Sequence, residues 1–234
     1  VQRRCESEPL PYTRGQIEFF GLTMTVTSDV LIPRPETELL IEEALAWLQD
    51  HLVRTTVDVG TGSGCIAVAL AVHAPQLQLY ATDISPAALR VAHRNAVQHD
   101  VASRIDFLEG DLLTPLSDLE STSDLDSTSS RVDMILSNPP YIAREEWDHL
   151  PPSVQREPRA ALMAGPQGLD IIRRLLQQVR TYLRPQGLLL MEIGEQQGEA
   201  VRAMAKRLLP NSKHAVLPDL AGKDRVLKLV KGKF

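Results

Sequence analysis

The chain has 234 residues with 30 acidic and 25 basic side chains, and its formal net charge of −5 argues against a broad nucleic-acid-binding surface. Hydrophobic residues make up 43% and charged residues 24%, as in ordinary soluble globular proteins, and no apolar run is long enough to cross a bilayer. Two cysteines, Cys5 and Cys65, and six scattered histidines give no disulfide framework and no metal-ligand spacing, so we expect no metal and a reducing, cytoplasmic location.

The N-terminal part is predicted as an arm followed by a hairpin. Residues 1–16 are polar, contain two prolines and lack an apolar signal core, so they are interpreted as an arm or linker. Residues 22–27 alternate between apolar and polar side chains, as in a half-buried strand, and residues 17–20 can pair with them across a glycine. We therefore predict an arm and a small β-hairpin appendage over residues 1–30 and one main domain over residues 31–234.

The main domain is predicted to begin with a helix. Pro35 suits the first helical position, and Glu36 and Glu38 suit the positive end of the helix dipole. The buried face of this helix is predicted from apolar residues at helical spacing, which are Ile41, Leu45, Leu48 and Leu52.

From residue 55 onward, predicted strands alternate with predicted helices. Strands are predicted over seven segments: residues 56–60, 77–82, 104–109, 132–137, 188–193, 214–217 and 225–230. Helices are predicted between them at residues 65–74, from Ser85 onward, at 168–183 and at 196–209, with a turn at 184–187. This order predicts an α/β fold with a doubly wound, mostly parallel seven-stranded sheet and helices on both of its faces.

Two segments interrupt this alternation. Residues 117–130 are almost all Ser, Thr, Asp and Leu, which is typical of a surface insertion without chemistry. Residues 142–167 form a long connection at the carboxyl edge of the predicted sheet, which is either a lid over a binding site or plain packing.

A glycine-rich loop, Gly60-Thr61-Gly62-Ser63-Gly64, joins the first predicted strand of this sheet to a helix. Glycines allow a sharp turn and a close approach of the backbone to a ligand, and the following helix offers free N–H donors. A nucleotide-like ligand at the sheet edge is the expected occupant. The dinucleotide fingerprint has its third glycine one position later, where this chain has a cysteine, so NAD is disfavoured.

Two carboxylates follow at the ends of the next two predicted strands. Asp83 is placed to accept hydrogen bonds from both hydroxyls of a ribose. Asp111 could accept from an adenine amino group while Leu112 covers the ring. Each carboxylate alone could equally be a strand-end cap or a solvated loop charge, but their order along successive strand ends favours a nucleoside site.

A proline-stiffened turn, Asn138-Pro139-Pro140-Tyr141, follows the fourth predicted strand of the sheet. Proline has no N–H and holds the preceding residue extended, so carbonyl oxygens of this turn are free to accept hydrogen bonds. The Asn138 side chain adds one acceptor and two donors, so the turn could grip a planar –NH2 group. The alternative is a rigid strand-ending turn with Tyr141 as half-buried filler, but its place downstream of Asp83 favours the functional interpretation.

In this order, the glycine loop, Asp83 and the Asn-Pro-Pro-Tyr turn resemble the class I S-adenosylmethionine-dependent methyltransferases that methylate a planar amino or amide nitrogen. Further segments strengthen the resemblance: Leu31-Ile32-Pro33-Arg34-Pro35-Glu36-Thr37-Glu38, Ser137 and Ile142 around the turn, Glu157-Pro158 with Ala161-Leu162, and Glu192-Ile193-Gly194. Together they look like the HemK/PrmC family, the N5-glutamine methyltransferases of peptide chain release factors. The resemblance covers nearly the whole chain and implies a Rossmann-like catalytic domain over residues 31–234.

The resemblance also implies an activity and a set of site residues. A methyl group would pass from S-adenosylmethionine, leaving S-adenosylhomocysteine, to the N5 amide nitrogen of a glutamine in a Gly-Gly-Gln loop of a release factor. The cofactor site would comprise Gly60, Thr61, Gly62, Ser63, Gly64, Asp83, Asp111, Leu112 and Asn138. The glutamine would be bound by Asn138, Pro139, Pro140 and Tyr141, of which Asn138, Pro139 and Tyr141 would be catalytic.

Some neighbouring residues are given weaker roles. Arg34 and Thr37 either help to close the site or cap the helix, and Glu157 and Glu192 are expected to organise loops through hydrogen bonds. Family members also carry an N-terminal helical domain that helps to recognise the release factor, and this sequence begins where the resemblance places the end of that domain.

Two other functions are compatible with the same residues. An N6-adenine methyltransferase of DNA or RNA could use the same turn, but it usually flips a base and needs a basic groove or a recognition domain, which the net charge and chain length oppose. A non-catalytic nucleoside-binding scaffold is a third reading, against which the intact Asn138 and Pro139 argue. We therefore expect release factors as partners, no membrane association and no stable binding of nucleic acid.

Overall fold

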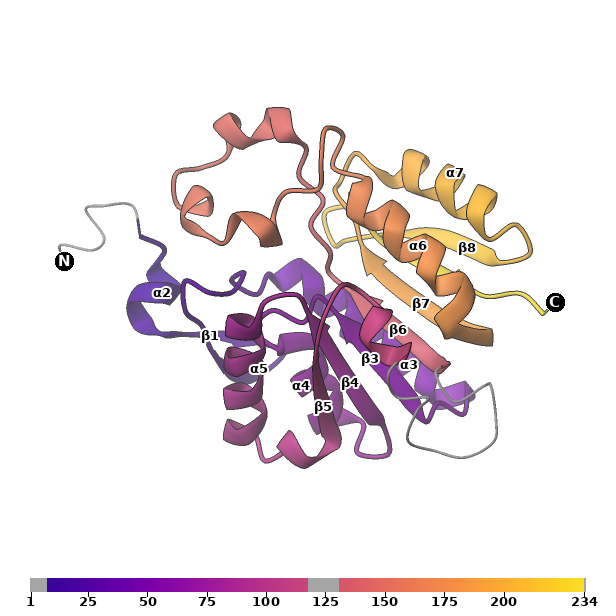
Figure 1. Cartoon of the computed structure of the whole chain (residues 1–234), viewed down its shortest axis with the longest axis horizontal. Helices are drawn as coiled ribbons and strands as arrows, with labels where there is room; N and C mark the ends of the chain where they lie inside the picture. Colours follow the sequence, from indigo (N-terminus) through magenta and orange to yellow (C-terminus); the bar gives the residue numbers. More distant parts are fainter. Residues whose placement is uncertain (1–7, 118–130, 234) are drawn as a thin grey trace.

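The fold is a seven-stranded sheet between two layers of helices. The computed structural model describes residues 8–117 and 131–233, so the predicted insertion lies almost wholly outside the described residues (Figure 1). The sheet order is β5-β4-β3-β6-β7-β9-β8. All neighbouring strands are parallel except at β9, which is antiparallel to both β7 and β8. The strands span Thr55–Val59 (β3), Gln78–Asp83 (β4), Ile105–Glu109 (β5), Val132–Ser137 (β6), Leu183–Glu192 (β7), Lys213–Pro218 (β8) and Asp224–Val230 (β9). The predicted doubly wound, mostly parallel sheet is confirmed.

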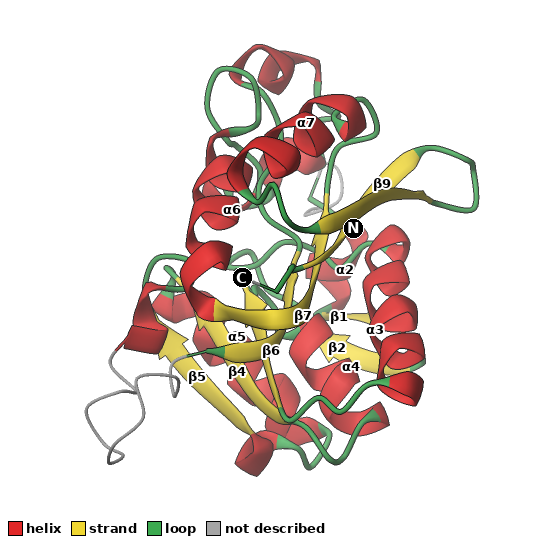
Figure 2. Cartoon of the chain, turned by 90° about the vertical axis from the view of Figure 1, so that its right-hand side faces the viewer, coloured by secondary structure: helices red, strands yellow, loops and turns green. Residues whose placement is uncertain are grey.

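Helices cover both faces of this sheet, as Figure 2 shows. One face carries α3 (Glu38–Asp50), α4 (Cys65–His73) and α5 (Pro86–Gln98), and the other carries α6 (Asp170–Tyr182) and α7 (Gly198–Leu208). Each face has its own buried apolar cluster, so both faces of the sheet are covered and only the ends of its strands can reach a ligand.

The predicted hairpin is present and is fastened to the main domain. β1 (Gln16–Phe19) and β2 (Leu22–Thr25) pair antiparallel. Asn95 of α5, which is fully buried, accepts a hydrogen bond from the Thr25 N–H at 2.8 Å and donates one to the Thr25 carbonyl at 3.0 Å. The Asn95 side chain thus pairs with the backbone of Thr25 as a neighbouring strand would, and it fixes the hairpin against α5.

The prediction of an arm over residues 1–16 is wrong for part of that range. A short helix, α2 (Leu10–Arg14), buries the ring of Tyr12, whose hydroxyl donates to the Val30 carbonyl at 2.5 Å. A helix of five residues is not stable alone, so this buried aromatic contact accounts for its presence.

Two further predictions are corrected by the structure. The prediction of a turn at 184–187 is wrong, because these residues lie inside β7. Their register with β6 is irregular, since Leu183 pairs with Val132 and the next paired residue of β7 is Leu188. The backbone of Gln186 and Gly187 stays in the sheet through hydrogen bonds to Lys231. The segment is therefore a bulge within the strand. Leu52 is not on the buried face of α3, since that helix ends at Asp50 and the Leu52 side chain is 82% exposed.

The connection after β6 contains three short 3₁₀ helices, η4 (Arg144–His149), η5 (Val154–Arg156) and η6 (Arg159–Ala161). In Figure 1 it stands beside the sheet, above α2. Its two ends are joined by an isolated bridge between Ile142 and Met163. None of the helices within residues 8–117 and 131–233 is long and apolar enough to span a bilayer.

Candidate active site

The sequence motifs meet at one edge of the sheet. The glycine loop follows β3, Asp83 ends β4, Gly110 follows β5 and Asn138 follows β6, and these four strands are consecutive neighbours in the order β5-β4-β3-β6. Because parallel strands present their carboxyl ends at the same edge, residues that lie far apart in the chain converge there.

The glycines of the loop fall into two kinds. Gly60 (φ +71°) has open space where a Cβ would stand, and a Cβ on Gly62 (φ +55°) would reach only the loop's own carbonyl at 4.0 Å. A Cβ on Gly64 (φ +78°) would instead lie 2.9 Å from the backbone of Ala92. The first two glycines therefore leave room for a ligand, and the third lets α4 approach α5.

The glycine loop is anchored by hydrogen bonds to a buried carboxylate, Asp58, which the sequence analysis did not single out. Asp58, which is fully buried at the end of β3, accepts hydrogen bonds from the Thr61 hydroxyl at 2.6 Å and the Ala67 N–H at 3.2 Å. Burial raises the pKa of Asp58 to about 7. The Thr61 hydroxyl is thus committed to Asp58, and Ser63 is also buried, with its carbonyl accepting from Asn95 at 2.8 Å. Thr61 and Ser63 shape the loop from inside.

Asp83 faces the loop with both carboxylate oxygens. One oxygen accepts from the Gly62 N–H at 2.9 Å and the other from the Ser85 N–H at 2.8 Å. Burial raises the pKa of Asp83, and the backbone hydrogen bonds from Ser85 and Gly62 oppose that shift. The next side chain, Ile84, is 68% exposed beside this carboxylate. Sequence reasoning missed Ile84, although an apolar residue directly after a strand-ending acid was the available signal.

The third strand end differs from the prediction in one respect. The Asp111 carboxylate forms an ion pair with Arg174 of α6, so it is already engaged by the protein. Leu112 has a left-handed backbone (φ +53°) and lies half-buried against the apolar cluster on the face of the sheet that α6 and α7 cover. Both residues lie at the edge where they were expected.

The Asn-Pro-Pro-Tyr turn is connected to two residues outside it. The Asn138 Nδ2 donates to Thr37 Oγ1 at 3.0 Å, and that hydroxyl donates to Glu192 Oε2 at 2.6 Å. The Tyr141 hydroxyl donates to the other oxygen of the same carboxylate at 3.3 Å. Burial raises the pKa of Glu192, and the hydrogen bond from Thr37 opposes that shift. Pro139 is buried in the turn, while Pro140 is half-buried.

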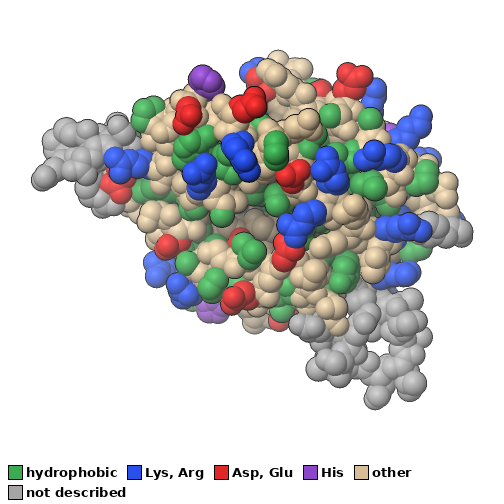
Figure 3. Space-filling model, turned by 45° about the horizontal axis from the view of Figure 1, so that its top comes forward, with side chains coloured by type: hydrophobic (Ala, Val, Ile, Leu, Met, Phe, Trp, Pro, Cys, Tyr) green, Lys and Arg blue, Asp and Glu red, His purple; other side chains and the backbone are tan. Residues whose placement is uncertain are grey.

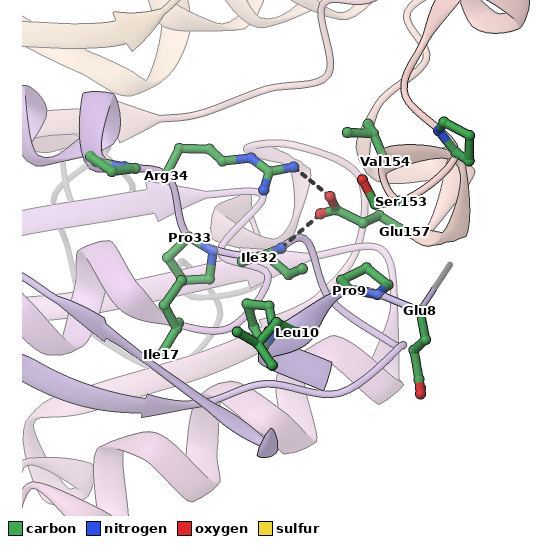
Figure 4. A pocket seen from close by; sticks show the side chains of 13 residues that line it. Glu8, Pro9, Leu10, Ile17, Ile32, Pro33, Arg34, Ser153, Val154 and Glu157 are labelled. Atoms are coloured by element: carbon green, nitrogen blue, oxygen red, sulfur yellow. Dashed lines mark hydrogen bonds and ion pairs between the residues drawn. The ribbon is translucent and has the colours of Figure 1, made fainter. Parts of the chain in front are cut away.

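Two cavities lie in this part of the molecule, and one of them borders the turn at Tyr141. One of about 290 Å³ is lined by Tyr141, Ile142, Glu146, Leu150, residues 194–197 and Arg225. The other, of about 630 Å³, lies between α2, residues 32–35 and residues 152–157 (Figure 4). Glu157, one of its lining residues, accepts from the Ile32 N–H at 3.0 Å and pairs with Arg34, so it organises this loop as the sequence analysis expected.

The surroundings of the edge contain many charges of both signs. Figure 3 shows Lys and Arg side chains in a band across the face that the top of Figure 1 presents, with acidic side chains between them. Among the described residues, no three His, Cys, Asp or Glu side chains gather as potential metal ligands.

Comparison with known sequences gives a family match and relatives that share one name. Residues 35–150 match the family described as Methyltransferase small domain. The chain is 44% identical to the release factor glutamine methyltransferase of Moorella thermoacetica, over 96% of this chain and 76% of that protein. It is 43% identical to the release factor glutamine methyltransferase of Geobacter sulfurreducens, over 88% of this chain and 68% of that protein.

Solved structures give the same fold at lower identity. The catalytic domain of hMettl16 in complex with a MAT2A 3′UTR hairpin superposes with a TM-score of 0.69 at 19% identity, over 92% of this chain and 77% of that one. The N-terminal domain of human METTL16 in complex with SAH superposes with a TM-score of 0.62 at 20% identity, with the same coverage. At these identities the likeness shows the fold alone.

Proposed function

The chain belongs to the release factor glutamine methyltransferase family, and on this basis we propose that S-adenosylmethionine is its methyl donor and that the Asn138 turn holds the acceptor glutamine. The enzyme methylates the side-chain amide of a glutamine in a peptide chain release factor. One observation supports the proposed site most strongly. Asn138, anchored by Thr37, follows the strand directly beside the one that leads into the open glycine loop.

The glycine loop and Asp83 fit the proposed donor. The space beside Gly60 and Gly62 allows a ligand to approach the backbone N–H groups. The two oxygens of Asp83 accept the Gly62 and Ser85 N–H groups, and the carboxylate keeps acceptor sites that suit the two hydroxyls of a ribose. When bound, S-adenosylmethionine supplies a methyl group activated by a positively charged sulfur.

The neighbouring strand ends would complete the donor site. Ile84 and Leu112 would offer apolar surface for the faces of an adenine ring, and Asp111, which pairs with Arg174 through one oxygen, would accept from its amino group through the other. Thr61, Ser63 and Gly64 would act indirectly, by holding the loop in its shape.

The acceptor glutamine would be gripped by two oxygens of the turn. A carboxamide nitrogen is a weak nucleophile because its lone pair is delocalised into the carbonyl group. Asn138 Oδ1 and the Pro139 carbonyl would each accept one of its N–H groups and so direct the lone pair at the methyl donor. Orientation of this kind can contribute roughly 7–11 kcal/mol. The same two oxygens would stabilise the positive charge that grows on the nitrogen.

Tyr141 and Pro140 would form the walls of the acceptor site. The Tyr141 hydroxyl is held by Glu192, so its ring has a fixed place beside the cavity of about 290 Å³. Glu192 already accepts hydrogen bonds on both of its oxygens and is buried, so it is not placed to act as a base. The surplus proton of the amide can leave to solvent after methyl transfer.

The proposal is tested by following a labelled methyl group. The protein is incubated with methyl-labelled S-adenosylmethionine and, in separate reactions, with a release factor, with duplex and single-stranded DNA, and with RNA. Label is expected on one glutamine of the release factor, identified by mass spectrometry, and a release factor with that glutamine replaced by alanine should stay unlabelled. Label on adenine, or cofactor binding without transfer to any acceptor, would contradict the proposal.

A further inference from the structure

We infer that Thr37 and Glu192 are positioning residues that determine which atom of the Asn138 amide faces the substrate. The inference rests on the proposed function, because it concerns how Asn138 receives a carboxamide N–H. The three side chains come from distant parts of the chain: the turn before α3, the end of β7 and the turn after β6.

The first step is the state of the Thr37 hydroxyl. Thr37 and Glu192 are each 1% exposed, and the hydroxyl lies 2.6 Å from Glu192 Oε2. With Glu192 ionised, its carboxylate only accepts hydrogen bonds, so the Thr37 hydroxyl donates its single proton to it. Toward Asn138 the same oxygen can then only accept. The Asn138 group at 3.0 Å from Thr37 must therefore be the –NH2, and the carbonyl oxygen Oδ1 is left for the substrate.

The second step is what this orientation achieves. The terminal torsion of an asparagine side chain is broad, so an unrestrained amide can turn over and present its –NH2 group instead of its oxygen. An –NH2 facing the –NH2 of a glutamine would set donor against donor. The hydrogen-bonded chain from Glu192 through Thr37 to Asn138 excludes that arrangement before the substrate arrives.

Competing roles for Thr37 and Glu192 are weaker. Thr37 stands at the N-terminal cap of α3, but its side chain makes no capping hydrogen bond there. Within the described part of the chain, Glu192 forms no ion pair with a Lys or Arg side chain, so its burial is not explained by a salt bridge. Its two oxygens accept from Thr37 and Tyr141, so one carboxylate supports the Asn-Pro-Pro-Tyr turn directly at Tyr141 and, through Thr37, at Asn138.

The test compares variants that change single hydrogen-bonding groups. Thr37→Val keeps the shape but cannot accept from Asn138, and Thr37→Ser keeps the hydroxyl. Thr56→Val is the matched control, because Thr56 is fully buried on β3 and its hydroxyl has no hydrogen-bond partner among the described residues. We expect Thr37→Val to lower kcat roughly 10- to 100-fold with an unchanged KM for S-adenosylmethionine, Thr37→Ser to restore most of the rate, and Thr56→Val to match the wild type.

Glu192→Gln is a second and independent variant. A glutamine amide can donate to Thr37, which lets the threonine donate to Asn138 Oδ1 and turns the –NH2 of Asn138 toward the substrate. We therefore expect a loss of kcat similar to that of Thr37→Val, with calorimetric binding of S-adenosylhomocysteine unchanged. This variant also keeps the test decisive should Thr37→Val not fold.

A double-mutant cycle separates positioning from general structural support. If Thr37 acts through Asn138, Thr37→Val should slow an Asn138→Ala enzyme no further. Rate losses that multiply in the double variant, or wild-type kcat in a folded Thr37→Val or Glu192→Gln, would overturn the inference. Failure of the proposed function is distinguishable, because the wild-type protein itself would then label no glutamine.

Discussion

The Asn138 side chain has two polar groups, one bonded to the protein and the other, Oδ1, proposed to bind the substrate. Its Nδ2 is taken by Thr37 at 3.0 Å, so the two groups of one amide serve different partners. Replacement by alanine would remove the acceptor while leaving the glycine loop and Asp83 intact. We expect Asn138→Ala to lower kcat by roughly 1,000-fold with little change in the affinity for S-adenosylmethionine, measured by single-turnover kinetics and calorimetry. Asn211→Ala, at an exposed position, serves as the control, and near-normal turnover of Asn138→Ala would remove the assigned role.

Asp83 is proposed to bind the ribose of the methyl donor. Its carboxylate is oriented by the Gly62 and Ser85 N–H groups, and the proposed ribose contacts are hydrogen bonds to a charged acceptor. We expect Asp83→Ala to weaken binding of S-adenosylhomocysteine roughly 10- to 100-fold in calorimetry. Asp106→Ala is the matched control, because that exposed carboxylate lies near the start of β5, where it bonds Gln78, and it should bind as the wild type does. Equal affinities for all three proteins would exclude the ribose assignment.

At the scale of single elements, the glycine loop has an open end at Gly60, proposed to face the cofactor, and a tightly packed end at Gly64. A Cβ on Gly64 would stand 2.9 Å from Ala92 in a left-handed backbone conformation, whereas a Cβ on Gly60 would meet no atom within 4 Å. We expect Gly64→Ala to lower the free energy of unfolding by about 2–4 kcal/mol, from backbone strain and overpacking of α4 against α5. Gly60→Ala should cost about 1–2 kcal/mol of stability and act mainly on cofactor affinity. Denaturant titrations of both variants check this, and equal destabilisation would contradict the division between the two glycines.

The elements also show what a sequence can and cannot specify. Alternating side chains predicted the hairpin, and the strand-helix alternation predicted the sheet, because both patterns come from burial on one face of a local segment. The helix α2 was missed because its only strong signal is Tyr12, whose partner Val30 lies eighteen positions away. The bulge in β7 was taken for a turn because Pro185 and Gly187 are turn-forming residues, while the Lys231 backbone that holds the segment in the sheet is distant in the chain.

Some features of the candidate site follow from local sequence patterns, and others depend on tertiary contacts. Gly60, Asp83 and Asn138 were placed correctly at one edge, since each follows a predictable parallel strand. The side-chain partners of the candidate site residues were not predictable. The pairing of Asp111 with Arg174 and the chain through Thr37 to Glu192 depend on side chains brought together only by tertiary packing.

For the whole molecule, buried carboxylates make stability depend on pH. Burial raises the pKa of Asp58 to about 7, and burial also raises the pKa of Asp83 and of Glu192. The folded protein therefore binds more protons than the unfolded chain between about pH 4 and pH 7, and its free energy of unfolding falls as the pH rises through that interval. For Asp58 alone the change amounts to about 4 kcal/mol.

Asp58→Asn tests this dependence. The asparagine oxygen can still accept from Thr61 and the Ala67 N–H, but the group no longer ionises. We expect the variant to show a flatter decline of unfolding free energy between pH 4 and pH 7, measured by denaturant titrations at several pH values. Asp106→Ala, which removes an exposed carboxylate, should retain the wild-type slope. An unchanged slope in Asp58→Asn would show that Asp58 does not titrate in this range.

The two halves of the site differ in how they are distributed along the chain. The strand ends proposed to bind the donor lie within residues 60–112, whereas the proposed acceptor site depends on positions 37, 138 and 192, which are joined across separations of 101 and 155 residues. The hydrogen bonds that orient Asn138 are therefore complete only once Glu192, at the end of β7, has joined the sheet, whereas the strand ends proposed to bind the donor all precede residue 113.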